Sequence, residues 1–171
     1  MQTSIAAEVL QLCREQGLTL AAAESCTGGL IAKELTDIPG ASQVFLGGVV
    51  SYTNHVKEQV LRVPAALLER CGAVSAPVAR AMALGARVLT GADLALSVTG
   101  LAGPDGDDRG NPVGTVFTAL AAPEGVFVEQ LALHLFKAVN GFNHMHRYAY
   151  CSRLIGYCAG YCLPYPPGGV G

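Results

Sequence analysis

Short apolar runs alternate with segments of helical period along most of the chain, and this alternation limits the fold to a few classes. Strands buried on both faces carry near-continuous apolar residues. Three runs have this composition and a suitable length: Leu18–Ala23, Val44–Tyr52 and Asp93–Thr99. A chain in which strands and helices alternate builds a sheet covered by helices on both faces. The sequence therefore predicts an α/β protein with three layers, α/β/α.

Two further strands are predicted without a helix between them. Gly114–Ala121 and Val126–Phe136 have strand composition, and Pro123-Glu124-Gly125 between them is typical of a hairpin turn. A hairpin pairs antiparallel strands, so the sheet is predicted to be mixed. The helices expected around it are Ser4–Gln16, Gly28–Leu35, His55–Leu61 with Asn54 as N-cap, a helix that starts at Pro64, and Ala76–Leu89 with Ser75 as N-cap.

The composition excludes several classes of protein. Hydrophobic residues make up 51% of the chain and charged residues 14%, whereas intrinsic disorder requires low hydrophobicity and high net charge. The formal net charge of −2 provides no basic surface for nucleic acid. No apolar run approaches the roughly 18 residues of a membrane span, and Met1-Gln2-Thr3-Ser4 lacks the features of a signal peptide. We expect a soluble, cytoplasmic protein without nucleic-acid or membrane partners.

The composition changes near residue 138. All 13 acidic residues lie at or before Glu129, whereas five of the six tyrosines and three of the six cysteines lie in 138–171. We therefore divide the chain into a coherent domain, 1–137, and an atypical tail, 138–171, for which disorder is one expectation. The histidines and cysteines of the tail lack the paired spacing of a zinc site, and no metal is expected: they are His144, His146, Cys151, Cys158 and Cys162. Cys13, Cys26 and Cys71 are predicted to be reduced thiols.

The first candidate site is Glu24-Ser25-Cys26-Thr27-Gly28-Gly29, which follows a predicted strand and opens a predicted helix. Such a turn brings backbone N–H groups and the positive end of the helix close to Ser25. That environment suits a phosphate or the oxyanion of acyl transfer. In the alternative interpretation, Ser25 or Thr27 only caps the helix. Cys26 ranks behind Ser25 as a nucleophile, because no histidine is placed to activate it.

The second candidate site lies at the end of another strand, in Ser51–Lys57. If Asn54 caps the helix, Lys57 falls in its first turn and its amine can fold over the strand end, near Tyr52. Burial beside the positive end of a helix disfavours the ammonium form, so this lysine could act as a base for a serine. The alternative is a solvated lysine and a tyrosine at the edge of the core.

The third candidate site is the long loop after Asp93–Thr99, in Ser97–Gly114. Its glycines allow the backbone to approach a ligand closely. The loop matches neither a phosphate-binding P-loop nor a dinucleotide-binding motif, and its aspartates lack the register of a calcium loop. It is predicted to form one wall of a ligand site, and a simple wide turn is the alternative.

The order and spacing of these motifs resemble the CinA C-terminal domain family, which includes the stand-alone nicotinamide-nucleotide amidase. The matching stretches are Ala22–Gly29, Gly48–Asn54 with Lys57, Gly72–Ser75, Ser97–Gly106 and Pro112–Val116. The resemblance runs from about residue 4 to Phe136, or roughly four fifths of the chain. It implies hydrolysis of the amide of nicotinamide mononucleotide to nicotinate mononucleotide and ammonia, with no cofactor or metal.

The resemblance also implies roles for individual residues. Ser25 corresponds to the family's nucleophile, Lys57 to its base, and Tyr52 to a tyrosine that assists proton transfer. To these we add backbone N–H groups near Cys26 and Thr27 as the expected oxyanion donors. The expected substrate-binding residues are Glu24, Cys26, Thr27, Gly28, Gly29, Thr99, Gly100 and Gly103. A homo-oligomer is also expected.

The chain departs from the family pattern after the last predicted strand. The family usually continues Phe-x-Gly-Asp-Arg and then a basic amphipathic helix, whereas Phe136 is followed here by Lys137-Ala138-Val139-Asn140. We hypothesise a shift of reading frame near 137–140, and a genuinely divergent tail is the alternative. An intact frame at the nucleotide level, with a helical tail, would contradict the hypothesis. Because an arginine expected near the substrate phosphate is lost, a catalytically impaired nucleotide-binding relic is one alternative function. The competence label of the family suggests another, an interaction protein.

Overall fold

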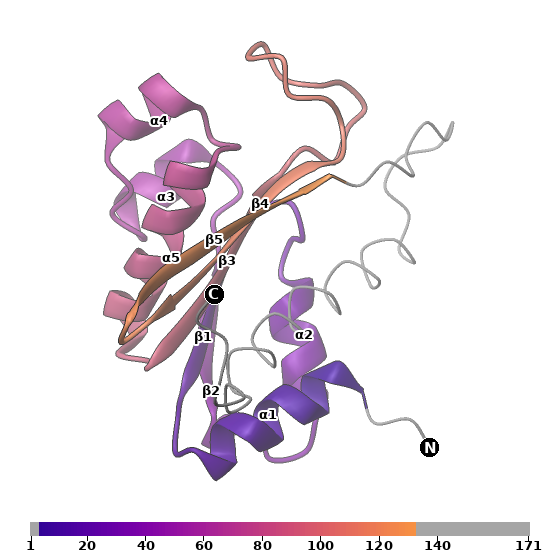
Figure 1. The fold of residues 1–171 in the computed structure, drawn as a ribbon, viewed down its shortest axis with the longest axis vertical. Helices are drawn as coiled ribbons and strands as arrows, with labels where there is room; N and C mark the ends of the chain where they lie inside the picture. The colour runs from indigo at the N-terminus through magenta and orange to yellow at the C-terminus, as the bar shows by residue number, and fades with distance from the viewer. Residues whose placement is uncertain (1–3, 133–171) are drawn as a thin grey trace, which may run out of the picture.

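A computed structural model of the chain describes residues 4–132 (Figure 1). The tail 138–171 and the predictions made for it lie outside the described residues, as does the end of the last predicted strand. The described elements, in chain order, are α1 (Ile5–Glu15), β1 (Leu20–Glu24), α2 (Leu30–Thr36), the short 3-10 helix η1 (Ala41–Gln43), β2 (Phe45–Val50), α3 (Asn54–Gln59), α4 (Ala65–Cys71), α5 (Ala76–Thr90), β3 (Leu94–Gly100), β4 (Thr115–Ala122) and β5 (Gly125–Ala132).

The strands form one mixed sheet in the order β2-β1-β3-β4-β5. β1 pairs in parallel with both β2 and β3, whereas β4 is antiparallel to β3 and forms a hairpin with β5. The prediction of a mixed α/β sheet is therefore confirmed. Since the chain passes from β1 to β2 on one side and then to β3 on the other, β1 marks a topological switch point, where open α/β sheets commonly bind ligands.

Helices cover both faces of the sheet, which confirms the three predicted layers (Figure 1). The alternation of side chains along β1 shows how one strand serves both cores. Leu20 and Ala22 pack in the cluster that includes residues of α1 and α2, whereas Ala21 and Ala23 pack in the cluster that includes residues of α4 and α5. The alanines of β1 allow the helices of both layers to approach the sheet closely.

Two helix starts differ from the sequence prediction. Thr53, and not Asn54, is the N-cap of α3, and its Oγ1 accepts a hydrogen bond from Val56 N. Both residue types cap helices well, so a shift of one position has little signature in the sequence. α2 begins at Leu30 and not at Gly28, because Gly29 is in the left-handed conformation, with φ +98°, and forms its N-cap.

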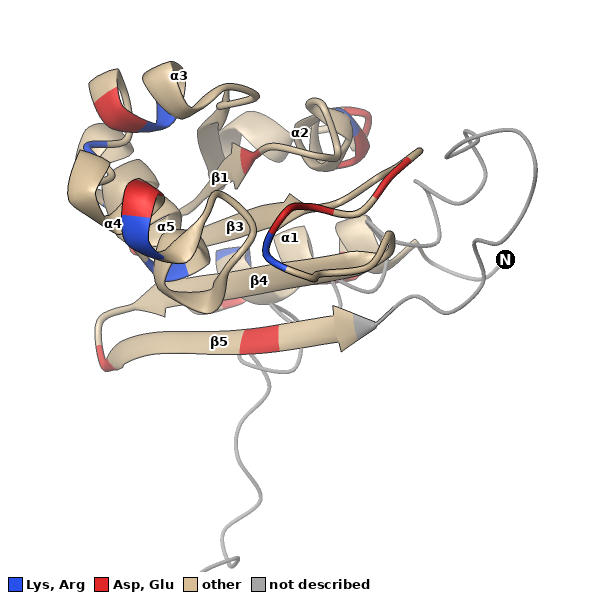
Figure 2. Ribbon diagram, turned by 90° about the horizontal axis from the view of Figure 1, so that it is seen from above, with Lys and Arg blue, Asp and Glu red and all other residues tan. Residues whose placement is uncertain are grey.

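The loop between β3 and β4 has its own internal framework. Asp107 Oδ1 accepts hydrogen bonds from the backbone N–H groups of Arg109 and Asn111, and its Oδ2 accepts one from Asn111 Nδ2. The Arg109 guanidinium donates to the carbonyls of Glu69 and Arg70 at the end of α4. Figure 2 shows the acidic and basic residues of this loop. The Asp107 bonds hold the loop together, and the Arg109 bonds fasten it to α4.

Candidate active site

Ser25 follows β1 directly, at the switch point of the sheet. A turn closed by the hydrogen bond from Gly28 N to Ser25 O, 3.1 Å long, carries the chain from the strand toward α2. The Ser25 side chain lies in a cavity at the carboxyl ends of β1 and β3, and the residue is 8% exposed. The strand-to-turn position predicted for this serine is therefore what the structure shows.

The N-terminus of α2 is capped by Glu24, a role that the sequence analysis did not anticipate. Its Oε2 accepts hydrogen bonds from Thr27 Oγ1 at 2.6 Å and from Gly29 N and Ile31 N at 3.1 Å, and its Oε1 accepts one from Ala32 N at 2.9 Å. The carboxylate is 1% exposed and faces the positive end of the helix, which stabilises its charge. The capping role considered for Ser25 and Thr27 thus belongs to their neighbour.

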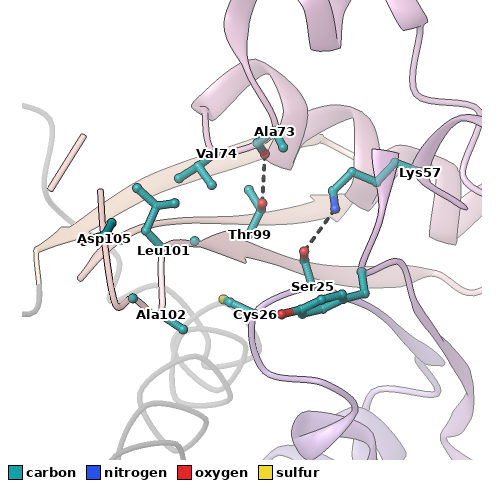
Figure 3. A pocket seen from close by; sticks show the side chains of 12 residues that line it. Ser25, Cys26, Lys57, Ala73, Val74, Thr99, Leu101, Ala102 and Asp105 are labelled. Atoms are coloured by element: carbon teal, nitrogen blue, oxygen red, sulfur yellow. Dashed lines mark hydrogen bonds between the residues drawn. The ribbon is translucent and has the colours of Figure 1, made fainter. Parts of the chain in front are cut away.

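Lys57 reaches the same cavity from α3. Its Nζ lies 3.0 Å from Ser25 Oγ and donates a hydrogen bond to the Ser51 carbonyl at 2.6 Å (Figure 3). The lysine is 1% exposed, so the amine is held between two partners and away from bulk water. The first and second candidate sites predicted from the sequence are therefore joined by a hydrogen bond between Lys57 and Ser25.

Burial lowers the pKa of Lys57 from 10.5 to about 8, and the nearby Cys26 opposes this shift. Desolvation disfavours the ammonium form, which is why the pKa falls. An amine with a pKa of about 8 is neutral in about one molecule in ten at pH 7, against far fewer than one in a hundred for an exposed lysine. The neutral amine has a lone pair and can accept a proton from Ser25.

The cavity in front of Ser25 has a volume of about 320 Å³, in the lower part of the range for small-molecule sites. The loop that follows β3 forms its opposite wall (Figure 3). Thr99 Oγ1 donates a hydrogen bond to Ala73 O at 2.8 Å and so joins the end of β3 to the segment before α5. At Gly100 a Cβ atom would lie 2.4 Å from the Val116 side chain, so only glycine fits where β3 pairs this closely with β4.

Seven residues predicted for the site line the cavity, and four do not. Those that line it are Ser25, Cys26, Tyr52, Lys57, Thr99, Gly100 and Gly103. Glu24 and Thr27 are buried beneath the turn, 1% and 2% exposed, and engaged with each other, which argues against direct contact with a substrate. Gly28 and Gly29 shape the turn toward α2 and are not part of the lining. Glu24 caps α2 and Thr27 donates to it, so both side chains are engaged away from the cavity.

Tyr52 lies at the rim of the cavity and is 74% exposed. Its neighbour Ser51 is fully buried and supplies the carbonyl that holds Lys57. Ser51 and Tyr52 directly follow β2, and their side chains differ sharply in exposure, one buried and the other at the rim. The lysine is therefore oriented by Ser51, which carried no predicted role.

The remaining lining residues come from two segments, and none was predicted individually. Ala73 and Val74 precede α5, and Leu101, Ala102 and Asp105 belong to the loop after β3. Sequence signals did exist, because Gly72–Ser75 and the loop were both part of the matching motifs.

Within residues 4–132, the structure shows no group of three or more histidine, cysteine, aspartate or glutamate residues arranged to hold a metal ion. No helix of that part of the chain has the length and hydropathy to cross a membrane.

Comparisons with known proteins agree with this architecture. The "CinA-like protein" of Geobacter sulfurreducens is 61% identical over 121 residues, which are 71% of this chain and 29% of that protein. The "CinA-like protein" of Geotalea uraniireducens is 57% identical over 126 residues, 74% of this chain and 30% of that protein. The chain thus spans about 30% of the length of these curated relatives.

Solved structures show the same fold. A competence/damage inducible protein from Agrobacterium tumefaciens superposes with a TM-score of 0.83 at 34% identity, covering 94% of this chain and 98% of the other. A CinA superfamily protein from Klebsiella pneumoniae gives a TM-score of 0.84 at 27% identity, covering 92% and 95%. Residues 2–140 match the family model described as the CinA C-terminal domain. The chain therefore belongs to the CinA C-terminal domain family.

Proposed function

We propose that this chain hydrolyses the carboxamide of nicotinamide mononucleotide, giving nicotinate mononucleotide and ammonia. The observation that carries the proposal is the 3.0 Å contact between Ser25 Oγ and Lys57 Nζ, in a cavity of about 320 Å³. A serine paired with a lysine of lowered pKa is a recognised combination for acyl transfer. The substrate itself comes from the resemblance of the motifs to the nicotinamide-nucleotide amidases.

In the acylation step, Ser25 Oγ attacks the carboxamide carbon while neutral Lys57 takes the hydroxyl proton. The carbonyl π bond opens to an oxyanion, for which backbone N–H groups near Cys26 and Thr27 are the proposed donors. As the tetrahedral intermediate collapses, the carbon–nitrogen bond breaks and the ammonium of Lys57 returns its proton to the leaving nitrogen. Ammonia departs, and the nicotinoyl group remains as an ester on Ser25.

Deacylation repeats the same proton transfers with water as the nucleophile. Lys57 takes a proton from the attacking water and returns it to Ser25 Oγ as the ester bond breaks. The hydrogen bond to the Ser51 carbonyl uses one N–H of the amine and so keeps Nζ beside Ser25 during both steps. Tyr52, at the rim, is proposed to assist proton transfer when the substrate covers it.

A second candidate function is a nucleotide-binding protein that retains the cavity and no longer turns over. It is favoured by the charge of the lining, in which Lys57 is the single basic residue among those described. A substrate phosphate therefore has no arginine or further lysine to pair with in that part of the cavity. This candidate predicts that nicotinamide mononucleotide raises the melting temperature of the protein but releases no ammonia.

The proposal is tested by measuring ammonia release from nicotinamide mononucleotide with no metal added. We expect turnover by the wild-type chain and its loss in Ser25→Ala, by at least about 10³-fold, because the nucleophile is removed. Ser42→Ala, the same change at an exposed serine outside the cavity, should retain full activity. With hydroxylamine in place of water, the acyl ester predicts formation of the hydroxamate. A folded wild type that binds the nucleotide without releasing ammonia would instead support the binding function.

A further inference from the structure

α3 ends in an irregular backbone that is directly bonded to Lys57. In a regular helix the Lys57 carbonyl accepts from the residue four positions on, but here Val63 N donates to it at 3.1 Å. Between these residues Arg62 has a φ of +58° and is the one non-glycine residue with positive φ among residues 4–132. A left-handed conformation is unfavourable for a residue with a side chain and persists where the surroundings impose it.

The residue before Arg62 lies directly against the backbone of α5. A Cβ atom placed on Gly85 would lie 2.0 Å from Leu61 O and 2.8 Å from Leu61 C, far inside any real contact distance. Helix α5 therefore meets the chain after α3 backbone to backbone, which only glycine permits. The Leu61 side chain is 1% exposed and packs in the core beside Met82 and Ala86, so the segment is fixed from within as well.

We propose that Gly85 is a positioning residue for Lys57. Because Gly85 has no side chain, the Leu61 backbone can pack directly against α5. The chain then turns at Arg62, in the left-handed conformation, and Val63 N donates its hydrogen bond to the Lys57 carbonyl. The amine at the other end of that lysine is placed between Ser25 and the Ser51 carbonyl. Gly85 touches neither the cavity nor the reacting atoms, and it acts through the backbone of α3.

The first test is Gly85→Ala, with Val88→Ala as the matched control on the same helix, where the side chain is 83% exposed. In an ordinary helix interior, glycine to alanine is favourable, whereas here the methyl group must displace Leu61 and with it α3. We expect kcat for nicotinamide mononucleotide to fall by roughly tenfold to a hundredfold with little change in KM, because a small misplacement of a reacting group slows chemistry more than binding. Val88→Ala should match the wild type.

A second readout does not depend on the amidase activity. The chain contains three lysines, Lys33, Lys57 and Lys137, so a side-chain NMR titration of lysines is readily assigned with Lys57→Met as the reference. In the wild type Lys57 should titrate near pH 8. In Gly85→Ala it should titrate at higher pH, because a displaced amine regains water. If the wild type releases no ammonia, the proposed function fails while this titration still decides the positioning role.

A matched pair at Arg62 covers the case in which Gly85→Ala does not fold. Arg62→Gly retains the left-handed turn and should leave both the rate and the Lys57 titration unchanged. Arg62→Val disfavours that turn, since β-branched residues resist positive φ, and should raise the pKa of Lys57 as Gly85→Ala does. An unchanged titration in a folded Gly85→Ala, or identical titrations for Arg62→Gly and Arg62→Val, would overturn the proposal.

Discussion

Lys57 is among the largest fully buried side chains of the described chain, and an enclosed amine without a function is an unfavourable choice for a core. A methionine or leucine would fill the same volume without desolvating a charge. The enclosure is what lowers its pKa to about 8 and so makes a base available near neutral pH. At the residue scale, the proposed base would explain why a costly buried amine stands at this position.

The rate of hydrolysis should therefore depend on pH through Lys57. The reacting form is the neutral amine, and it becomes more abundant as the pH rises toward and through about 8. We expect kcat/KM to increase about tenfold per pH unit below this value and to level off above it. The measurement is a pH profile with substrate well below KM, and a rate that is constant between pH 6 and 9 would argue against a lysine base.

Replacing Lys57 separates its chemical role from its structural one. Lys57→Met should lower kcat/KM by about 10²–10⁴-fold, because no base remains beside Ser25. The free energy of unfolding should be retained or increased, since an apolar side chain of similar length replaces a buried amine. Urea denaturation and ammonia release, measured on the same preparation, test both expectations. A large loss of stability in this variant would show that the amine holds the fold together.

At the scale of elements, Glu24 determines how β1 passes into α2. Four donors converge on its carboxylate, three of them backbone N–H groups. The turn that carries Ser25 lies between this carboxylate and the helix that it caps. The geometry of the candidate nucleophile therefore depends on an acidic residue that does not face the cavity.

Glu24→Ala should lower the free energy of unfolding by about 2–4 kcal/mol, because buried donors are left without an acceptor and a charged cap is lost. Glu69→Ala, an exposed glutamate on α4, is the matched control and should change stability by less than about 0.5 kcal/mol. Urea denaturation measures both. If the two variants were equally stable, the capping of α2 by Glu24 would contribute nothing to folding.

The sequence predicted the elements well where apolar period and helix caps agree, and the contacts less well where they depend on turn geometry or on tertiary packing. Every described helix and strand except the short η1 was expected, because apolar period and Gly or Pro boundaries are local signals. Glu24 was assigned to the substrate because it belongs to the matching motif. Its four hydrogen bonds to residues three to eight positions ahead depend on the geometry of the turn, for which the sequence has no local pattern. The backbone contact of Gly85 with Leu61 joins distant segments, so the sequence contains no sign of it.

At the scale of the molecule, the site is assembled by the sheet. Ser25 follows β1 and Thr99 lies near the end of β3, and the carboxyl ends of these two neighbouring parallel strands meet at one edge. Lys57 reaches the same edge from the chain that follows β2. That convergence follows from the strand order, which the sequence analysis did not derive. The volume of the cavity and the near-complete burial of Lys57 were not predicted either, because they depend on how α3, α5 and the loop after β3 pack together.

The chemistry proposed for this assembly needs no metal ion, so chelation should leave it intact. Activity in excess EDTA is expected to match that of the untreated protein, and added Mg²⁺ or Zn²⁺ should not raise it. The described lining supports this, since its one acidic residue is Asp105 and it contains no histidine. Loss of turnover on chelation, restored by one particular metal, would contradict the serine–lysine mechanism.

The pairing of β1 with both β2 and β3 also has a consequence for how the protein acquires its activity. Ser25 and Lys57 are 32 residues apart, and Thr99 and Ala73 are 26 apart, so both contacts form only after crossover connections have closed. Such non-local pairings are slow compared with the formation of local helices. During refolding from denaturant, the helical circular dichroism signal will return first and turnover last. Recovery of the proposed activity would therefore report when the parallel core is complete.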